Sequence, residues 1–210
     1  CILCLLISVI SLPLIAQNII YSNLKELLTQ HGDTTAVLRV EKRSRNQIVL
    51  TGGADYRITA GDDESMCRRL KKRCFAVRDE KGNLYLNCRK LRYKKLRFGA
   101  WYAPAVQLGK NIYFCAMPLG SVIGGNFVEE DDVKLGGNIG DALAASSLVT
   151  KRVCYELNGE TGKVDFLGKD RMLQLLKNYP ELKQAYLKDD SQEAKHTFKY
   201  LLELQNKQKK

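Results

Sequence analysis

Residues 75–88 read FAVRDEKGNLYLNC, and this stretch decides the fold class. Its two apolar runs, 75–77 and 84–86, flank the triplet Lys81-Gly82-Asn83, which is typical of a turn between antiparallel strands. Apolar side chains alternate along the second run as far as Cys88, so that strand is expected to bury one face. The stretch therefore predicts a β-hairpin.

Short runs rich in aromatic and β-branched residues extend this pattern along the chain. The expected strands are residues 37–40, 48–50, 56–58, 96–98, 101–103 and 112–116, and a second hairpin is expected to join 153–157 to 163–167. A twisted antiparallel sheet accommodates such runs most simply. The fold class predicted is α+β, with an antiparallel β-sheet core, short flanking helices and a C-terminal helical segment.

Helical signals surround the expected sheet. The helices are predicted at Ser22–Gln30, at Asp62–Arg73, from Gly168 onward, from Pro180 onward, and after a capping box at Asp190 and Glu193. Acidic residues open the second of these helices and basic residues close it, which suits the helix dipole. We expect residues 17–210 to form one domain, mostly β over 17–167 and helical over 168–210.

The first sixteen residues differ from the rest. An apolar run over 2–15 ends in Leu14-Ile15-Ala16-Gln17, which is typical of the cleavage region of a secretory signal peptide. The competing interpretation is a retained membrane anchor, which needs about 20 apolar residues. The signal peptide is preferred because Pro13 and Ala16 suit cleavage. We expect an exported protein, in the periplasm, at the outer membrane or outside the cell, with no membrane span after cleavage.

Export makes disulfides possible among the cysteines of the mature chain. These number five: Cys67, Cys74, Cys88, Cys115 and Cys154. An odd number leaves at least one unpaired, and sequence cannot select a pattern. Cys88 and Cys115 lie in strand patterns in which they could face each other. The preferred interpretation treats all five as small buried core residues, since there is no C-x-x-C pair.

Positive charge is concentrated in one segment. The chain has 34 Lys and Arg against 23 Asp and Glu, a net charge of +11, and residues 65–99 hold thirteen of the basic residues with two acids. Such a basic stretch beside aromatic strands favours an anionic partner. The candidate anion-binding residues are Arg68, Arg69, Lys72, Arg92, Lys94, Lys95 and Trp101. An anionic glycan, lipopolysaccharide or an envelope protein is the expected partner, and the export signal argues against nucleic acid. A solvated basic face with aromatics in the core is the interpretation preferred for the charge itself, since basic runs alone are a weak signal.

Catalytic and cofactor motifs are missing from the sequence. The two histidines, His31 and His196, form no H-E-x-x-H pair, and residues 159–164 have the wrong glycine spacing for a phosphate loop. We therefore expect no cofactor, no metal and no enzyme, but a non-catalytic binding or envelope-interaction protein. The alternative is a glycan or peptidoglycan hydrolase whose two carboxylates are brought together by the fold. A third possibility is docking on another envelope protein through the small residues 136–145 of the glycine-rich segment 119–148.

Several separated motifs are similar to a known family. They are residues 21–28, 51–57, 84–88, 111–114 and 161–164, followed by paired C-terminal helices. Together they resemble a family of uncharacterised secreted proteins of Gram-negative gut anaerobes. The resemblance implies export and one α+β domain, and it carries no assigned activity and no functional residues.

Overall fold

The protein is described here from a computed structural model. The structure describes residues 17–35, 37–44, 46–48, 53–94, 96–116, 152–189 and 194–209. The expected signal peptide at 1–16, the segment 119–148, Lys95 and the capping box at Asp190 and Glu193 lie outside these residues. No helix within the described ranges is long and apolar enough to cross a membrane.

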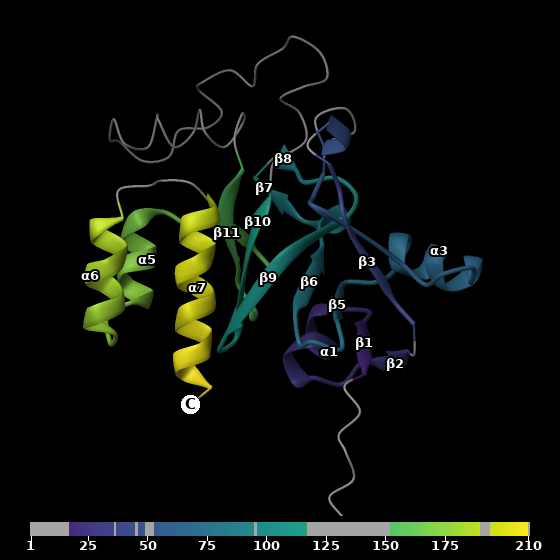
Figure 1. The fold of residues 1–210 in the computed structure, drawn as a ribbon, viewed down its shortest axis with the longest axis horizontal. Coiled ribbons are helices and arrows are strands. Elements are labelled where there is room, and N and C mark those ends of the chain that lie inside the picture. Colours follow the sequence, from purple (N-terminus) through teal and green to yellow (C-terminus); the bar gives the residue numbers. More distant parts are fainter. Residues whose placement is uncertain are drawn as a thin grey trace, which may run out of the picture.

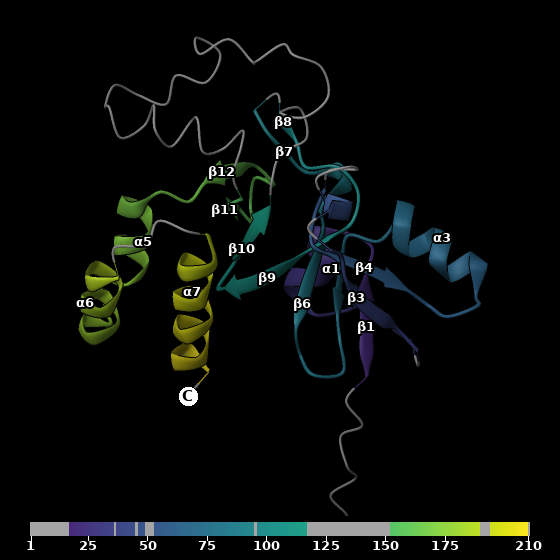
Figure 2. The ribbon, with the colours of Figure 1, turned by 45° about the horizontal axis from the view of Figure 1, so that its top comes forward.

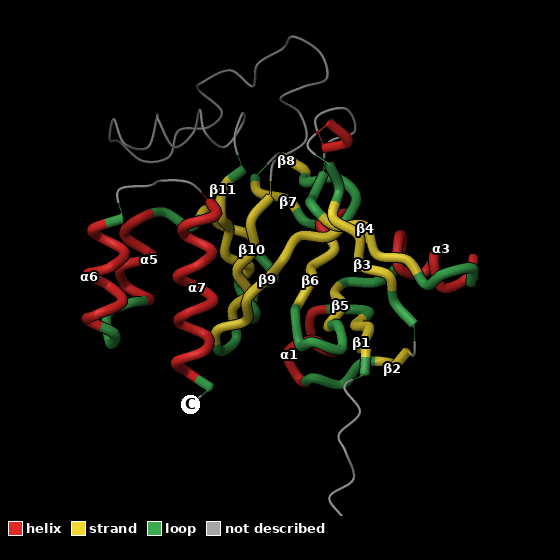
Figure 3. Tube along the Cα trace, viewed as in Figure 1, coloured by secondary structure: helices red, strands yellow, loops and turns green. Residues whose placement is uncertain are grey.

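The described strands form one large antiparallel sheet and a separate small hairpin (Figures 1 and 3). The sheet contains β1 (Asn18–Tyr21), β2 (Asp33–Thr35), β3 (Arg39–Lys42), β4 (Tyr56–Thr59), β5 (Ala76–Arg78), β6 (Leu84–Asn87), β9 (Tyr102–Leu108), β10 (Asn111–Ala116), β11 (Val153–Leu157) and β12 (Val164–Phe166). Its main path runs β12-β11-β10-β9-β6-β5-β1-β2, and β4 joins β3 to β9. The hairpin pairs β7 (Arg92–Tyr93) with β8 (Leu96–Arg97). The predicted α+β class is confirmed.

Both predicted hairpins are present. In the first, Ala76 of β5 pairs with Leu86 of β6. The carboxylate of Asp79 accepts backbone hydrogen bonds from Lys81 (3.0 Å) and Asn83 (2.8 Å), which closes the turn. The second hairpin joins β11 to β12. Both connections therefore lie where the sequence places them.

The helices are short except for the last. They are α1 (Leu24–Thr29), α3 (Glu64–Lys72), the 3-10 helix η1 (Cys88–Lys90), α5 (Lys169–Leu175), α6 (Pro180–Lys188) and α7 (Ala194–Gln208). Asn23, rather than Ser22, caps α1, because its side chain accepts from the backbone of Glu26 at 2.9 Å. Asp63 caps α3 in the same way through the backbone of Met66, as its acidic start predicts.

Both faces of the central strands are buried. In β10, Ile112 and Phe114 enter one core cluster, whereas Tyr113 enters a second cluster together with Leu201 and Leu204 of α7. This alternation follows from the two-residue period of a strand. Figures 1 and 2 show α7 packed beside β9 and β10, with α5 and α6 farther from the sheet. The C-terminal helices thus cover one face of β9–β11.

A disulfide joins Cys115 of β10 to Cys154 of β11. The two residues are direct partners in the antiparallel register. The preferred interpretation of five unpaired core cysteines is therefore wrong, and Cys88 does not pair with Cys115. Cys67, Cys74 and Cys88 are free. The sequence could not show this pairing, because strand order was not known.

The prediction of a strand at 48–50 is wrong for residue 48. Ile48 lies in a helical turn, and residues 49 and 50 are outside the described ranges. The turn begins with a reciprocal cap: the Ser44 backbone donates to Gln47 Oε1 (2.9 Å), and the Gln47 backbone donates to Ser44 Oγ (3.2 Å). The spacing Ser44-x-x-Gln47 is typical of a helix start, whereas the apolar residues after it led to the prediction of a strand.

Candidate anion-binding surface

The basic residues gather around two hollows. The larger, which we call the basic hollow, has a volume of about 370 Å³ and lies between the β7–β8 hairpin and the turn that joins β11 to β12. It is lined by Lys90, Leu91, Arg92, Lys94, Gly162, Lys163, Val164 and Asp165. Four of these side chains are cationic and one is acidic. All four cations are exposed, so they can meet a ligand from solvent.

A second, smaller hollow of about 20 Å³ adjoins it. Its lining consists of Ser22, Lys72, Arg73, Cys74, Phe75, Asn87, Arg89 and Lys90. Lys90 lines both hollows, so the basic residues from the end of α3 to the β11–β12 turn form one surface. We call this set, Lys72, Arg73, Arg89, Lys90, Arg92, Lys94 and Lys163, the basic surface.

Asn87 positions the middle of the basic surface. Its side chain is buried and donates to the carbonyls of Leu70 (3.1 Å) and Cys74 (2.9 Å) near the end of α3. Its Oδ1 accepts from the backbone of Arg89 (3.1 Å), which starts η1. One buried amide therefore ties η1, which carries Arg89 and Lys90, to the C-terminal end of α3.

The β7–β8 hairpin is anchored by its apolar pair. Tyr93 and Leu96 are cross-strand partners and both are buried. The ring of Tyr93 lies 5.6 Å from that of Tyr155 in β11. Because side chains alternate along a strand, Arg92 and Arg97 point the other way, and both are exposed. The hairpin thus presents guanidinium groups beside the basic hollow.

The structure separates the residues predicted as the site. Lys72 lines the small hollow, and Arg92 and Lys94 line the basic hollow, while Lys95 lies outside the described residues. Arg68 is exposed on α3 but lines neither hollow. Arg69 forms an ion pair with Asp33 of β2. Three of the seven predicted residues therefore meet on the basic surface.

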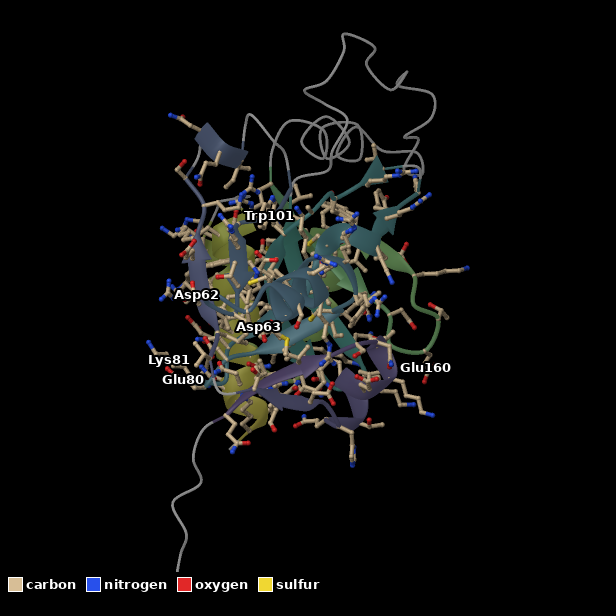
Figure 4. All side chains as sticks on the ribbon, turned by 90° about the vertical axis from the view of Figure 1, so that its right-hand side faces the viewer. Asp62, Asp63, Glu80, Lys81, Trp101 and Glu160 are labelled. Atoms are coloured by element: carbon tan, nitrogen blue, oxygen red, sulfur yellow. A yellow bond between two sulfur atoms is a disulfide. The ribbon has the colours of Figure 1, made fainter. Side chains whose placement is uncertain are left out.

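Trp101 is not part of the basic surface. Its ring is flanked by the guanidinium groups of Arg43 (5.2 Å) and Arg57 (5.7 Å). In Figure 4 it lies well away from Glu160, which marks the β11–β12 turn. The neighbouring Tyr102 is buried and donates its hydroxyl to the Leu70 carbonyl at 2.7 Å. Trp101 therefore lies apart from the two hollows, and the Tyr102 ring belongs to the core.

Four members of the basic surface were missing from the predicted site: Arg73, Arg89, Lys90 and Lys163. The first three lie in the basic segment 65–99, so charge density was their signal. Lys163 had no signal, because it lies far along the chain and reaches the hollow only through the fold. It shares the hollow with Gly162, whose missing side chain would meet no atom within 4 Å.

Catalytic groups do not gather at these hollows. The buried carboxylates of the described residues are Asp55 and Glu156, and each has an arginine partner. Burial raises the pKa of the Cys74 thiol to about 11, so it stays protonated at neutral pH and is a poor nucleophile. Within the described ranges, no group of three or more His, Cys, Asp or Glu is arranged to hold a metal ion.

The geometry therefore defines an antiparallel α+β protein with a cationic surface hollow. The chain belongs to a family of unknown function, DUF6563, whose model matches residues 19–208. Among curated proteins no significant match was found. The solved structures likewise contain no significant match.

Proposed function

We propose that the protein is an exported, non-catalytic binding module, one α+β domain over residues 17–210, which holds an anionic glycan on the basic surface. The glycan class includes the phosphorylated sugars of lipopolysaccharide. The basic hollow carries the proposal, because four cations from two separate parts of the chain line one depression. Clustered like charges repel each other, and an anionic ligand relieves that repulsion.

The surroundings of the basic hollow favour a glycan over single-stranded nucleic acid. Sequence-tolerant binding of single strands relies on aromatic rings that stack on the bases. None of the described residues that line the hollow is aromatic, and the nearby Tyr93 is buried. Its contacts are therefore charges and hydrogen bonds, which suit the acidic groups of a glycan.

Export is supported by the disulfide between Cys115 and Cys154. Disulfides persist in oxidising compartments such as the periplasm and the cell exterior. An exported basic protein meets the anionic polymers of the cell envelope, which agrees with the proposed origin in Gram-negative gut anaerobes. The location inside or outside the outer membrane follows from fractionation of cells that express the protein.

The test places one charge in the basic hollow. Gly162 has a positive φ of +68° and open space at its missing side chain, and Gly82 in the β5–β6 turn has the same two properties at φ +81°. Figure 4 shows Lys81, the neighbour of Gly82, on the opposite side of the molecule from Glu160. Asp and Asn tolerate this conformation better than other residues. The variants are Gly162→Asp, its neutral counterpart Gly162→Asn, and Gly82→Asp as the remote control with the same charge change.

Each variant is titrated with a heparin-like oligosaccharide, with lipopolysaccharide and with DNA at about 150 mM salt, where long-range attraction is screened. We expect Gly162→Asp to bind the glycans about fivefold more weakly, and the other two variants to stay within about twofold of the parent protein. Equal weakening by both Asp variants would show that only net charge matters, and the proposal would fail. Stronger binding of DNA than of either glycan would also overturn it.

The alternative, a hydrolase acting on glycan or peptidoglycan, gains no support from the hollows. Such chemistry needs two carboxylates about 5 to 10 Å apart. Among the described residues, Asp165 is the one carboxylate that lines the basic hollow, and none lines the small hollow. The alternative is assessed in the same titrations by measuring new reducing ends in the glycan.

A further inference from the structure

The β7–β8 hairpin is built against local backbone preference. Its two strands are joined by Lys94 and Lys95, and two-residue connections favour Asn-Gly or Asp-Gly because they need positive φ. Lys94 has a φ of +52°, which a lysine rarely adopts. Its ammonium lies 5.5 Å from the centre of the Tyr93 ring, which is a cation–π contact.

The other non-glycine residues with positive φ have evident compensation. Gln30 ends α1, and its backbone N–H reaches the carbonyls of Glu26 and Leu27. Trp101 has its ring flanked by two arginines. Lys94 differs from both, because it lies at an exposed hairpin tip where a cation–π contact such as that with Tyr93 contributes little. Unfavourable backbone with little structural gain is typical of functional sites.

Charge pairing in the hairpin is also unfavourable. Arg92 lies directly opposite Arg97, and directly opposed side chains share a face with their Cβ atoms about 5 Å apart. Like charges at such positions destabilise a strand pair. No ion pair joins either arginine, or Lys94, to another residue in the described part of the chain. Arg92 and Lys94 line the basic hollow, and Arg97 lies directly across the strand pair from Arg92.

We infer that this hairpin is a receptor for one tetrahedral oxyanion, a phosphate or sulfate ester on the glycan, held between Arg92 and Arg97 with Lys94 beside it. A carboxylate has one charge and two oxygens, which a single guanidinium fork satisfies. Two guanidinium groups and an ammonium match an ester group with three free oxygens. The inference rests on the proposed function, since the glycan carries the ester.

The test removes the opposed charge while keeping a residue that favours strands. Arg97→Thr is compared with Arg39→Thr in β3, an exposed strand arginine that faces Thr59 rather than another cation. Both variants lose one positive charge. Each is titrated with a sulfated oligosaccharide and with an oligogalacturonate that carries only carboxylates, and each is unfolded in urea.

We expect Arg97→Thr to bind the sulfated oligosaccharide about tenfold more weakly while its affinity for the oligogalacturonate changes by less than about threefold. Its urea midpoint should equal or exceed that of the parent protein, because a like-charge pair is gone. Arg39→Thr should bind both ligands with the affinity of the parent protein. Intact and dephosphorylated lipopolysaccharide then test the phosphate ester: a preference for the intact form identifies phosphate, and equal binding of the two leaves the sulfate ester of the oligosaccharide as the group that is held.

Unchanged selectivity in Arg97→Thr would overturn the inference and leave the proposed function standing, since the glycan would still bind. A fall in stability together with affinity for both ligands would overturn it as well, because that result indicates a structural arginine. Failure of the parent protein to bind either oligosaccharide would overturn the proposed function and the inference together.

Discussion

The two hairpins that border the basic hollow differ in how well their turn residues suit the backbone conformation. In the β11–β12 turn, Asn158 Oδ1 accepts the backbone hydrogen bonds of Glu160 and Thr161, both at 2.9 Å. Gly162 takes the left-handed position at φ +68°. In the β7–β8 turn the left-handed position belongs to Lys94, at φ +52°. One hairpin thus forms from local preference, whereas the other is held by its surroundings.

The same contrast holds for like charges across each strand pair. Glu156 of β11 lies opposite Asp165 of β12, but Arg171 of α5 meets the Glu156 carboxylate with two hydrogen bonds of 2.8 Å. Arg92 and Arg97 have no described counterpart of that kind. Repulsion is therefore neutralised within the fold at one hairpin and left for a ligand at the other. The comparison indicates that a charged pair with a partner inside the fold supports the structure, whereas a charged pair without one is a candidate binding site.

The largest expected effect comes from removing the disulfide that joins β10 to β11, the strand that carries Glu156. The double variant Cys115→Ala with Cys154→Ala should lower the free energy of unfolding by about 3 kcal/mol, because the unfolded chain regains the entropy of an open loop. Urea unfolding measures this. Cys67→Ala, which removes a free thiol, is the control. An unchanged midpoint in the double variant would show that the disulfide adds nothing to the stability of β10–β11.

The second largest effect is expected from removing the charge of Arg171, which compensates that of Glu156. Burial alone raises the pKa of Glu156, but hydrogen bonds from Arg171 and Tyr113 outweigh it and hold the pKa below its usual value. Arg171→Leu should cost about 2 kcal/mol of stability at pH 7, since a mostly buried carboxylate loses its charged partner. Urea unfolding at several pH values measures both this loss and its cause.

The pH dependence gives the sign of the Glu156 contribution. A carboxylate whose pKa is depressed by folding stabilises the protein above its unfolded pKa, and that stability is lost as the pH falls through the folded value. The difference between the parent protein and Arg171→Leu should therefore shrink below about pH 4. A difference that stays constant across this range would exclude the ion pair as its source.

The smallest expected effect is a gain in stability. Lys94→Gly removes the unfavourable side chain from a left-handed position and should raise the free energy of unfolding by about 0.5 kcal/mol. It should also weaken binding of the sulfated oligosaccharide, because one cation is gone. Thermal unfolding and titration measure the two quantities. A loss of stability would show that Lys94 is already well accommodated, and the contrast between the hairpins would disappear.

Local signals were sufficient to predict much of the fold. The β5–β6 and β11–β12 hairpins were visible because turn residues and apolar alternation agree there. The ends of α3 were visible in its charges. Ser44-x-x-Gln47 was overlooked because the apolar residues after it suggested a strand. Short apolar runs do not distinguish a strand from a helical turn without such a cap.

The site was less predictable for a physical reason. Charge density identified the segment that carries Arg92 and Lys94, but the number of charges does not say which ones meet. Arg69 lies in the same segment and is neutralised by Asp33, which precedes it by more than thirty residues. Lys163 joins the hollow from the far end of the sheet path. Such partners depend on strand order, which the sequence does not display.

The bond between Cys115 and Cys154 also has a topological consequence. It closes residues 115–154 into a covalent ring whose base is the β10–β11 pair. A protease that cuts once inside this ring opens it but does not separate the products, which stay joined until a reductant acts. The chain on either side of a cut therefore remains one molecule wherever reductants are scarce.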